Sequence, residues 1–350
     1  MRITIKDIAL KAGVSKTTVS FAFNDPSKIS QATCERVLLF ANQLGYVPDP
    51  VARTLTTKRI GAIGLLLPQP MHEALRNPYL GELIQGIGAA CLEHESALMI
   101  VPPIKGRLIE AARRAMVDAV LAIGVGPDHD VVALMKNRHL PLVTIDGDSD
   151  DGFPNVGIDD EAAAYELMSH VLAFGHRRVA VIQLDVDDCV SSEGKGSGLC
   201  SRRMAGFYRA MADSALDPEG GAMVLYRASC SLDGGRTAGA AILDDGTATA
   251  VVAMADIVAM GLYQVCQSRG VSIPTDLSIV SFDDIELASL VKPGLTSIRQ
   301  PGYMKGYVAG SALLAMQKGA SLDIALSDEA ATMSYRLVIR DSAAAPRDGS

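Results

Sequence analysis

The stretch "KAGVSKTTVSFAFND", Lys11 to Asp25, decides the fold of the amino-terminal part of this 350-residue chain. The pattern before it, "TIKDIALKA", predicts a short helix with Thr4 as N-cap, and Gly13 is typical of the position just past a helix end. Ser15 is expected to cap a second helix over Lys16–Phe23. Two short helices around such a tight turn are typical of the DNA-binding helix-turn-helix motif.

A third helix is predicted from "SQATCERVLLFANQLG", residues 30–45. Ser30 is a suitable N-cap and Gly45 a suitable stop. The apolar face expected to brace the first two helices consists of Val37, Leu38, Ala41 and Leu44.

The second helix should display one face outward. At about 100° per residue, its small side (Thr18, Val19 and Ala22) can pack on the other helices, while Lys16, Thr17, Ser20 and Phe21 gather opposite. Against a DNA groove, a lysine can bond a guanine edge or a phosphate, hydroxyls can bond bases, and the Phe21 ring can contact a thymine methyl group. The alternative is that Phe21 folds back and completes a small core.

Charge is distributed unevenly along the chain. The first sixty residues hold nine Lys and Arg against four Asp and Glu, and the remainder holds 23 against 36, within a net charge of -8. A basic head on an acidic body suggests that only the head contacts an anionic polymer. The alternative is that these charges are simply solvated faces.

The segment "YVPDPVARTLTTKR", residues 46–59, predicts a short hinge helix. Pro48 and Pro50 prevent the third helix from continuing, but Asp49 can cap a new helix that has Pro50 in its first turn. Its apolar face would hold Val51, Ala52 and Leu55. About two turns are too short to be stable alone, so this helix needs a symmetry mate or DNA.

From Ile60 onward, short apolar runs alternate with helical stretches. "GAIGLLLP", "ALMIVPP", "AVLAIGVG", "LPLVTID", "RVAVIQL", "AMVLYRA", "TATAVVAMAD" and "LSIVSFDD" read as strands buried on both faces. This alternation predicts two doubly wound α/β lobes with parallel sheets. Ligands bind beyond the carboxyl ends of such strands, where Gln69, Asp146, Asp185, Asp256 and Asp283 lie. The alternative for each of these carboxylates is a structural role as a helix cap or loop group.

The segments "IKDIALKAGVSKTTVSFAFN" and "ERVLLFANQLGYVPDPVARTL" resemble the DNA-binding head and hinge of the lactose-repressor (LacI/GalR) family of transcriptional regulators. The resemblance implies a repressor that binds pseudo-palindromic operator DNA as a homodimer. In it, Leu55 takes the position of the wedge that paired hinge helices push into the minor groove. The DNA-binding positions that it implies are Thr4, Ser15, Lys16, Thr17, Ser20, Phe21, Asn24, Ala52 and Leu55.

"RNPYLGELIQGI", "FGHRRVAVI", "SRRMAGF", "IPTDLSIVSFDD" and "LTSIRQP" extend this resemblance through the body. The family's body is similar to periplasmic sugar-binding proteins, which implies a small-molecule effector, a sugar or sugar derivative, between the lobes. Arg203 takes the position of the effector-clamping arginine, and Asp146 and Asp283 those of carboxylates that accept hydroxyl hydrogen bonds. The implied effector-binding residues are Gln69, Tyr79, Asp146, Arg203, Cys230, Ala255 and Asp283.

The expected domains are a helix-turn-helix head (1–47), a hinge (48–59), an effector-binding body (60–341) and a tail (342–350). Lobe 1 should comprise about 60–160 plus 292–325, and lobe 2 about 161–291 plus 326–341. No leucine heptad follows the body, so a dimer is expected rather than a tail-tethered tetramer.

Several function classes are disfavoured. The chain shows no signal peptide and no apolar run of about 18 residues, so we expect a cytoplasmic protein without a membrane partner. The scattered cysteines fit reduced thiols better than disulfides or a zinc site, and neither metal nor cofactor is expected. "SSEGKGSGLC", residues 191–200, departs from the phosphate-loop pattern and reads as a flexible loop.

Two rival functions remain to be compared with a regulator. A solute-binding protein for transport would need an export signal and no basic head. An enzyme acting between the lobes would need a catalytic motif; His176, in "FGHRR", has no nucleophile placed beside it by any known motif and reads as structural.

Overall fold

The computed structural model describes residues 3–49, 54–55, 57–126, 129–148, 153–185, 198–321, 326 and 331–347. The chain divides into two compact units, Met1–Gly61 and Ala62–Ser350. We call them the head and the body and describe each by itself.

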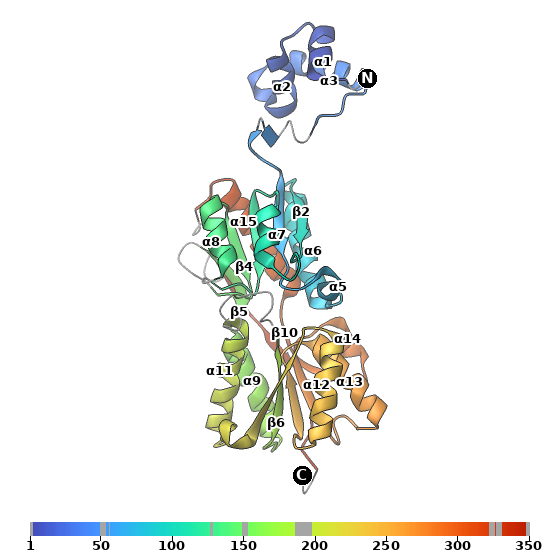
Figure 1. The fold of residues 1–350 in the computed structure, drawn as a ribbon, viewed down its shortest axis with the longest axis vertical. Coiled ribbons are helices and arrows are strands. Elements are labelled where there is room, and N and C mark those ends of the chain that lie inside the picture. Colours follow the sequence, from blue (N-terminus) through green and yellow to red (C-terminus); the bar gives the residue numbers. More distant parts are fainter. Residues whose placement is uncertain are drawn as a thin grey trace. The chain divides into compact units, whose positions relative to one another are not determined.

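The head contains the three predicted helices, α1 (Ile5–Ala12), α2 (Lys16–Asn24) and α3 (Gln31–Gln43), with a single 3-10 turn, Pro26–Lys28, after α2 (Figure 1). Gly13 ends α1 with a left-handed backbone, φ 65°. Ser15 accepts a hydrogen bond from the Thr18 amide, and Ser30 accepts one from the Thr33 amide. The sequence predictions of these helices and their caps are confirmed.

The core of the head is small and mostly aliphatic. Ile8, Val19 and Val37 are fully buried, and four alanines on the three helices complete the cluster. Leu38, predicted to lie on the apolar face of α3, is instead 42% exposed. Val37 and Ala41 are about one turn apart and face the core, whereas Leu38 is rotated about 100° from Val37 around the helix axis.

The hinge is described only in part. Thr54, Leu55 and Thr57 are helical, and the Lys58 amide donates to the Thr54 carbonyl at 2.8 Å. The Leu55 side chain is 78% exposed. Residues 50–53 and 56 lie outside the described part of the chain, and with them the predicted DNA-binding residue Ala52.

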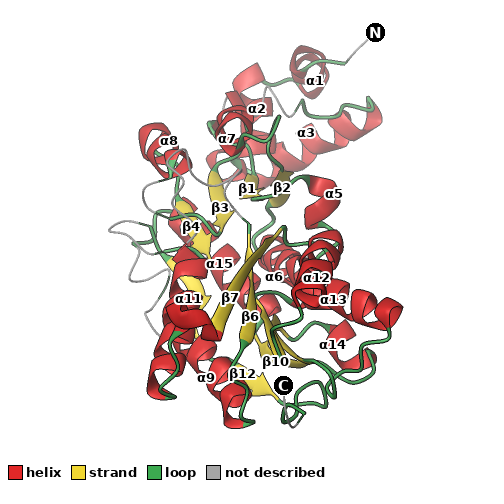
Figure 2. Ribbon diagram, turned by 60° about the horizontal axis from the view of Figure 1, so that its bottom comes forward, coloured by secondary structure: helices red, strands yellow, loops and turns green. Residues whose placement is uncertain are grey.

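The body holds two six-stranded sheets among its described residues (Figure 2). The first has the order β11-β5-β4-β3-β1-β2 and the second β12-β10-β9-β8-β6-β7, and all pairings are parallel except that of β10 with β12. The strands of the first are β1 (Ala62–Leu66), β2 (Ala97–Val101), β3 (Ala119–Ile123), β4 (Leu142–Ile145), β5 (Asn155–Ile158) and β11 (Thr332–Met333). Those of the second are β6 (Val179–Leu184), β7 (Met223–Ala228), β8 (Ala250–Ala253), β9 (Ser278–Asp283), β10 (Thr296–Arg299) and β12 (Arg336–Val338).

Helices cover both faces of each sheet, as expected for a doubly wound fold (Figures 1 and 2). The first sheet is flanked by α6 (Pro78–Glu93) and α15 (Gly302–Gln317) on one face and by α7 (Leu108–Arg114) and α8 (Asp130–Arg138) on the other. The second lies between the pairs α9 (Asp160–Ala173) with α11 (Gly198–Asp213) and α12 (Leu232–Asp245) with α13 (Asp256–Arg269). Two short helices, α5 (Met71–Ala74) and α14 (Glu286–Leu290), follow β1 and β9.

The pairing corrects the expected lobe boundaries. β10 pairs with β9 in the second sheet, although 292–325 was assigned to lobe 1, and β11 pairs with β5 in the first sheet, although 326–341 was assigned to lobe 2. The chain therefore crosses between lobes near residues 300 and 334. The local pattern did not reveal this, because both strands are short and the sequence alone does not indicate which sheet a short strand joins.

Two further expectations are corrected. β2 and β7 are edge strands and are partly exposed rather than buried on both faces. The segment from residue 342, expected to be a tail, begins inside the second lobe. Ser342 is fully buried, its carbonyl accepts from the Ile279 amide, and its hydroxyl accepts from the Thr296 amide.

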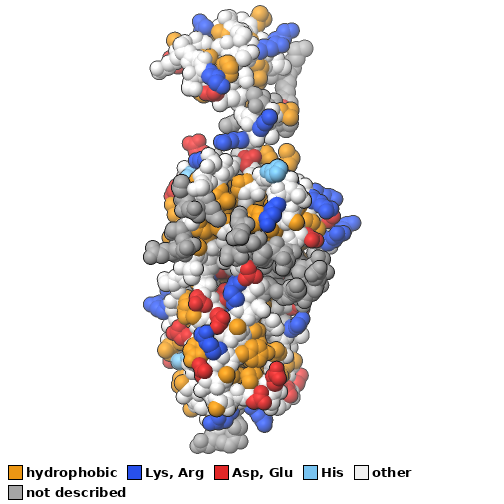
Figure 3. Space-filling view, turned by 90° about the vertical axis from the view of Figure 1, so that its left-hand side faces the viewer, with side chains coloured by type: hydrophobic (Ala, Val, Ile, Leu, Met, Phe, Trp, Pro, Cys, Tyr) orange, Lys and Arg blue, Asp and Glu red, His pale blue; other side chains and the backbone are white. Residues whose placement is uncertain are grey.

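One face of the body carries charges of both signs (Figure 3). On the face shown in Figure 3, Asp and Glu side chains alternate with Lys and Arg rather than forming one acidic patch. Such an arrangement is typical of a solvated surface. No described helix is long and apolar enough to span a membrane.

Candidate functional site

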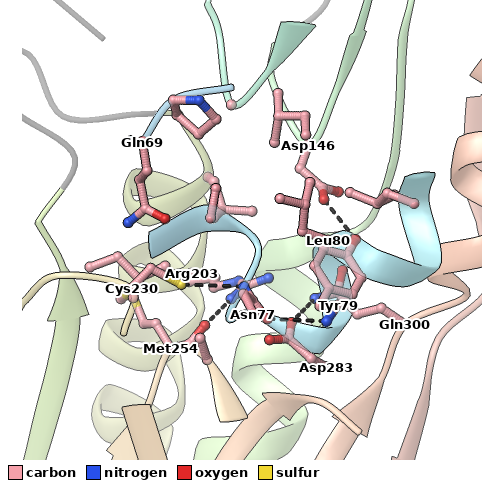
Figure 4. A pocket seen from close by; sticks show the side chains of 18 residues that line it. Gln69, Asn77, Tyr79, Leu80, Asp146, Arg203, Cys230, Met254, Asp283 and Gln300 are labelled. Atoms are coloured by element: carbon pink, nitrogen blue, oxygen red, sulfur yellow. Dashed lines mark hydrogen bonds between the residues drawn. The ribbon is translucent and has the colours of Figure 1, made fainter. Parts of the chain in front are cut away.

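A cavity of about 120 Å³ lies between the two sheets of the body, at the carboxyl ends of their strands (Figure 4). The structure brings all the residues that the sequence suggested for the effector to its wall: Gln69, Tyr79, Asp146, Arg203, Cys230, Ala255 and Asp283. Asn77 and Gln300, which the sequence reasoning missed, also line it. The remaining wall is largely aliphatic, with Leu80 and Met254 among its residues.

On the first-lobe side, Asp146 follows β4 and meets Tyr79 of α6. The Tyr79 hydroxyl donates to Asp146 Oδ2 at 2.8 Å, and the Lys305 ammonium donates to Asp146 Oδ1 at 2.5 Å. Burial, followed by the charge of Asp146, raises the pKa of Tyr79 well above its ordinary value. The phenol therefore stays protonated and able to donate.

On the second-lobe side, Asp283 ends β9 and accepts from Gln300 Nε2 at 2.8 Å. Burial raises the pKa of Asp283 to about 7, although the nearby Arg203 and Lys305 cations act in the opposite direction. A carboxyl group that titrates near neutrality can accept a hydrogen bond from a ligand hydroxyl or donate one to it.

Arg203 of α11 lies under the cavity and is 2% exposed. Its Nε donates to Asp160 Oδ1 at 2.9 Å, its Nη1 donates to the Met254 carbonyl at 2.6 Å, and its guanidinium lies 3.9 Å from the centre of the Phe282 ring. Burial lowers the pKa of Arg203, but the charges of Asp160 and Asp283 outweigh this and raise it. The guanidinium is thus a fixed, charged donor at the cavity wall.

The cavity also has a weakly polar side. Asn77 caps α6 and its amide lies 3.5 Å from the Cys230 sulfur, across the lobe boundary. Burial raises the pKa of Cys230 to about 12, so its thiol is neutral and a weak hydrogen-bonding partner. Ala255 adds only a methyl group.

Two more strand-end carboxylates fit the structural alternative rather than the cavity. Asp256 is fully buried and accepts from the Ser297 hydroxyl at 2.7 Å and the Ile285 amide at 2.9 Å. Burial, then the charge of Asp283, raises the pKa of Asp256 well above its ordinary value. Asp185 is exposed. Neither lines the cavity.

A second interlobe contact lies beside the cavity. Arg202, the neighbour of Arg203 on α11, forms an ion pair with Asp148 in the loop after β4, and its other nitrogen donates to Asp160 Oδ2 at 3.1 Å. Asp160, which is fully buried, therefore holds both arginines. It was missed because it reads in sequence as an ordinary first-turn acid of α9.

Lys305 is the most informative residue that the sequence reasoning missed. It is the only Lys, Arg, Asp or Glu in α15, "GYMKGYVAGSALLAMQ", and it is 0% exposed. A lone charge in an otherwise apolar helix is a signal that can be recognised from sequence. Gly306 allows the close packing of α15 on α6, because a Cβ there would lie 2.1 Å from the Leu83 carbonyl oxygen.

The outward face of α2 is the candidate DNA-binding surface. Lys16 and Thr17 are exposed, and Ser20, Phe21 and Asn24 are partly exposed. Phe21 is absent from the head core, so the alternative that it completes that core is wrong; Phe23 packs there instead, with its ring 5.5 Å from that of Tyr46. The Lys28 ammonium lies 5.3 Å from the Phe21 ring centre.

The other proposed DNA contacts have local roles as well. The Thr4 hydroxyl donates to the Asp7 carboxylate at 2.7 Å, which lowers the pKa of Asp7, and Ser15 caps α2. Asn24 donates to the Ser20 hydroxyl at 3.3 Å. These bonds fix the ends of the helices that carry the surface.

Of the two features weighed as signals of an enzyme, His176 has a structural role. His176 is buried and bonds the Thr249 hydroxyl and the Ala344 carbonyl at 2.8 Å each, so it fastens the carboxy-terminal segment. Most of the stretch tested as a phosphate loop, residues 191–197, lies outside the described residues. The described residues hold no cluster of three or more His, Cys, Asp or Glu side chains that could bind a metal ion.

Two family models match the chain. Residues 4–49 match the family model "Bacterial regulatory proteins, lacI family", and residues 168–343 match a "Periplasmic binding protein-like domain". The chain is 32% identical to the HTH-type transcriptional regulator Rv3575c of Mycobacterium tuberculosis, over 89% of this chain and 90% of that protein. It is 29% identical to the HTH-type transcriptional repressor CytR of Escherichia coli, over 90% of each.

Among solved structures, the fold is similar to that of a lac repressor dimer bound to operator and the anti-inducer ONPF. The TM-score is 0.75 at 22% identity, covering 99% of this chain and all of that chain. At this identity the likeness concerns the fold.

Proposed function

Because the chain belongs to the LacI family of bacterial regulatory proteins, we propose that it is a repressor whose operator binding is controlled by a small molecule in the interlobe cavity. It is a DNA-binding transcriptional regulator. The observation that carries the proposal is that α2 has one buried and one exposed face. Val19 and Ala22 are buried in the head, while Lys16 and Thr17 are exposed and available to contact bases.

The DNA contacts proposed here follow from the chemistry of that face. Lys16 suits a guanine edge or a phosphate, and the Phe21 ring suits a thymine methyl group. A homodimer would present two such faces to a pseudo-palindromic site, and Leu55 of each hinge would enter the minor groove. The exposed Leu55 side chain supports this role.

The ligand proposed for the cavity is an uncharged sugar or sugar derivative. Asp146 and Asp283 supply acceptors and Arg203 supplies a donor, a combination that suits alternating hydroxyl groups. The protein would bind this ligand without turning it over, because the relatives that it resembles are transcriptional regulators. Binding and DNA affinity would be linked reciprocally.

The test is selection of duplexes from a random pool by the full-length protein, followed by binding measurements across salt concentrations. We expect enrichment of an inverted repeat and an affinity that falls as salt rises. Lys16→Ala should weaken binding to the selected site and reduce its salt dependence. Equal binding of the enriched repeat and of random DNA under all salt conditions would refute the proposal.

The ligand is tested separately by thermal shift with sugars, sugar phosphates and nucleosides, because a ligand that binds the folded form raises the melting temperature. We expect a neutral sugar or its derivative to raise it, and Arg203→Ala to lose the response.

A further inference from the structure

Lys305 is a buried cation with no donor to spare. Its ammonium donates to Asp146 Oδ1 at 2.5 Å, to Gln300 Oε1 at 2.6 Å and to the Tyr79 hydroxyl at 3.0 Å. An ammonium group has three N–H donors and no acceptor, so these bonds use all of them. Lys305 can therefore hold its neighbours in place but has nothing left for a ligand.

The neighbours complete a directional network. The Tyr79 hydroxyl accepts from Lys305 and donates to Asp146 Oδ2, so both oxygens of Asp146 are bonded. Gln300 accepts from Lys305 through Oε1 and donates to Asp283 through Nε2. The reversed amide would point its NH₂ group at the ammonium, so only one orientation of Gln300 satisfies both bonds.

This network crosses the lobe boundary. Asp146 directly follows β4 of the first sheet, whereas Asp283 ends β9 of the second, and Lys305 of α15 connects them through Gln300. We call the chain Asp146–Lys305–Gln300–Asp283 the lobe bridge. Each of its members is at most 6% exposed, so water does not compete with its bonds.

The residues at both ends of the lobe bridge have positive φ angles, which are unusual for residues other than glycine. Asp146 has φ 55° and Asp283 has φ 111°, in the region that favours glycine. Such conformations cost free energy and persist only where the surroundings hold them. The side-chain bonds of Asp146 and Asp283 to the lobe bridge are suited to supply that restraint.

We propose that Lys305 is a positioning residue that fixes the two cavity carboxylates, one from each lobe, relative to each other. A ligand that forms a hydrogen bond with either carboxylate then affects the placement of both lobes, because its contact changes one hydrogen bond of the lobe bridge. This rests on the proposed function, in which lobe placement controls DNA binding. In this proposal the residue that links the lobes, Lys305, does not itself bind the ligand.

The test measures lobe placement without requiring a known ligand. Keto amino acids at two exposed sites, Asn137 of α8 and Ala212 of α11, accept spin labels without reaction at the native cysteines, and pulsed electron resonance gives the distance between them. We expect one narrow distance distribution in the labelled protein. Lys305→Met should broaden it or shift it.

Removal of Lys305 alone leaves Asp146 buried with one bond fewer, and that variant can lose stability for this reason. A second variant, Lys305→Met with Asp146→Asn, leaves no unpaired charge and should keep the fold while the distribution stays broadened or shifted. Lys318→Met, an exposed position just after α15, is the matched control and should keep the narrow distribution. A double variant that folds and retains the narrow distribution would overturn the proposal.

The test of the lobe bridge can succeed or fail independently of the test of the proposed function. Operator selection by the unmodified protein tests DNA binding, whereas the distance measurement uses no DNA. If operator selection fails but the distance distribution broadens in the Lys305 variants, the lobe bridge is supported and the proposed function is not. If the distance distribution is unchanged in the variants while operator binding is intact, the lobe-bridge proposal fails and the proposed function is retained.

Discussion

Arg203 and Asp160 form a buried ion pair, with Arg203 Nε 2.9 Å from Asp160 Oδ1 and both side chains at most 3% exposed. The pair joins α11 to the start of α9 within the second lobe. The arginine that the family resemblance places as the effector clamp is therefore also a structural residue of its lobe.

For this reason Arg203→Ala should have two effects. It should abolish the ligand response, and it should lower the free energy of unfolding by about 3 kcal/mol, because Asp160 would keep its buried charge with a poorer set of partners. Urea denaturation measures the second effect. The variant that also carries Asp160→Asn should recover part of the stability but not the response; a full ligand response in either variant would show that Arg203 does not contact the ligand.

Phe21→Ala and Phe23→Ala form a matched pair on α2. Phe23 packs on the head core, so its removal should destabilise the head by about 3 kcal/mol. Phe21 is outside that core, so its removal should change stability by no more than about 0.5 kcal/mol and alter base preference at one position of each half-site. Thermal denaturation and binding to a set of single-base operator variants check both. If the Phe21→Ala variant keeps the base preference of the unmodified protein, Phe21 does not take part in base recognition.

Leu55→Ala tests the hinge. Leu55 is largely exposed in the head unit, and a wedge between base steps would bury it. We expect operator affinity to fall about tenfold, or ~1.4 kcal/mol, and the bend of the DNA to decrease. Gel mobility of circularly permuted operator fragments reports the bend, with Thr57→Ala as the nearby control. A bend equal to that of the unmodified protein would exclude the wedge.

Asp283 should make stability depend on pH in an identifiable direction. Its pKa rises from 3.8 to about 7 on folding, so between these values the folded protein holds a proton that the unfolded chain has lost. The unfolding free energy contributed by this group therefore falls as pH rises from about 4 to about 7 and then levels off. The charges that act on the pKa of Asp283 are those of Arg203, Lys305 and Asp146, and the charge of Asp283 in turn raises the pKa of the neighbouring Asp256.

Asp283→Asn removes this group. Urea denaturation at pH 4.5 and pH 7.5 should show the unmodified protein losing stability relative to Asp283→Asn at the higher pH. Asp185→Asn, at an exposed strand end, is the control. A stability difference between the unmodified protein and Asp283→Asn that is the same at both pH values would contradict the raised pKa.

Much of the fold was readable from local sequence. Caps such as Ser15 and Ser30 placed the head helices, because a helix end needs a side chain to satisfy its free amides. The longer apolar runs placed eight strands. The short strands β5, β10, β11 and β12 were missed, because none of them lies in an apolar run long enough to indicate a strand.

The sequence by itself determined a head of three helices, a two-lobed α/β body and, through resemblance, the residues that now line one cavity. Only the tertiary structure decided that Lys305 joins Asp146 to Asp283, that Asp160 holds two arginines, and that β10 belongs to the second lobe. The physical reason is that helices and strands follow from neighbours along the chain. Buried polar partners meet only when segments up to 226 residues apart pack together, as Lys305 and Tyr79 do.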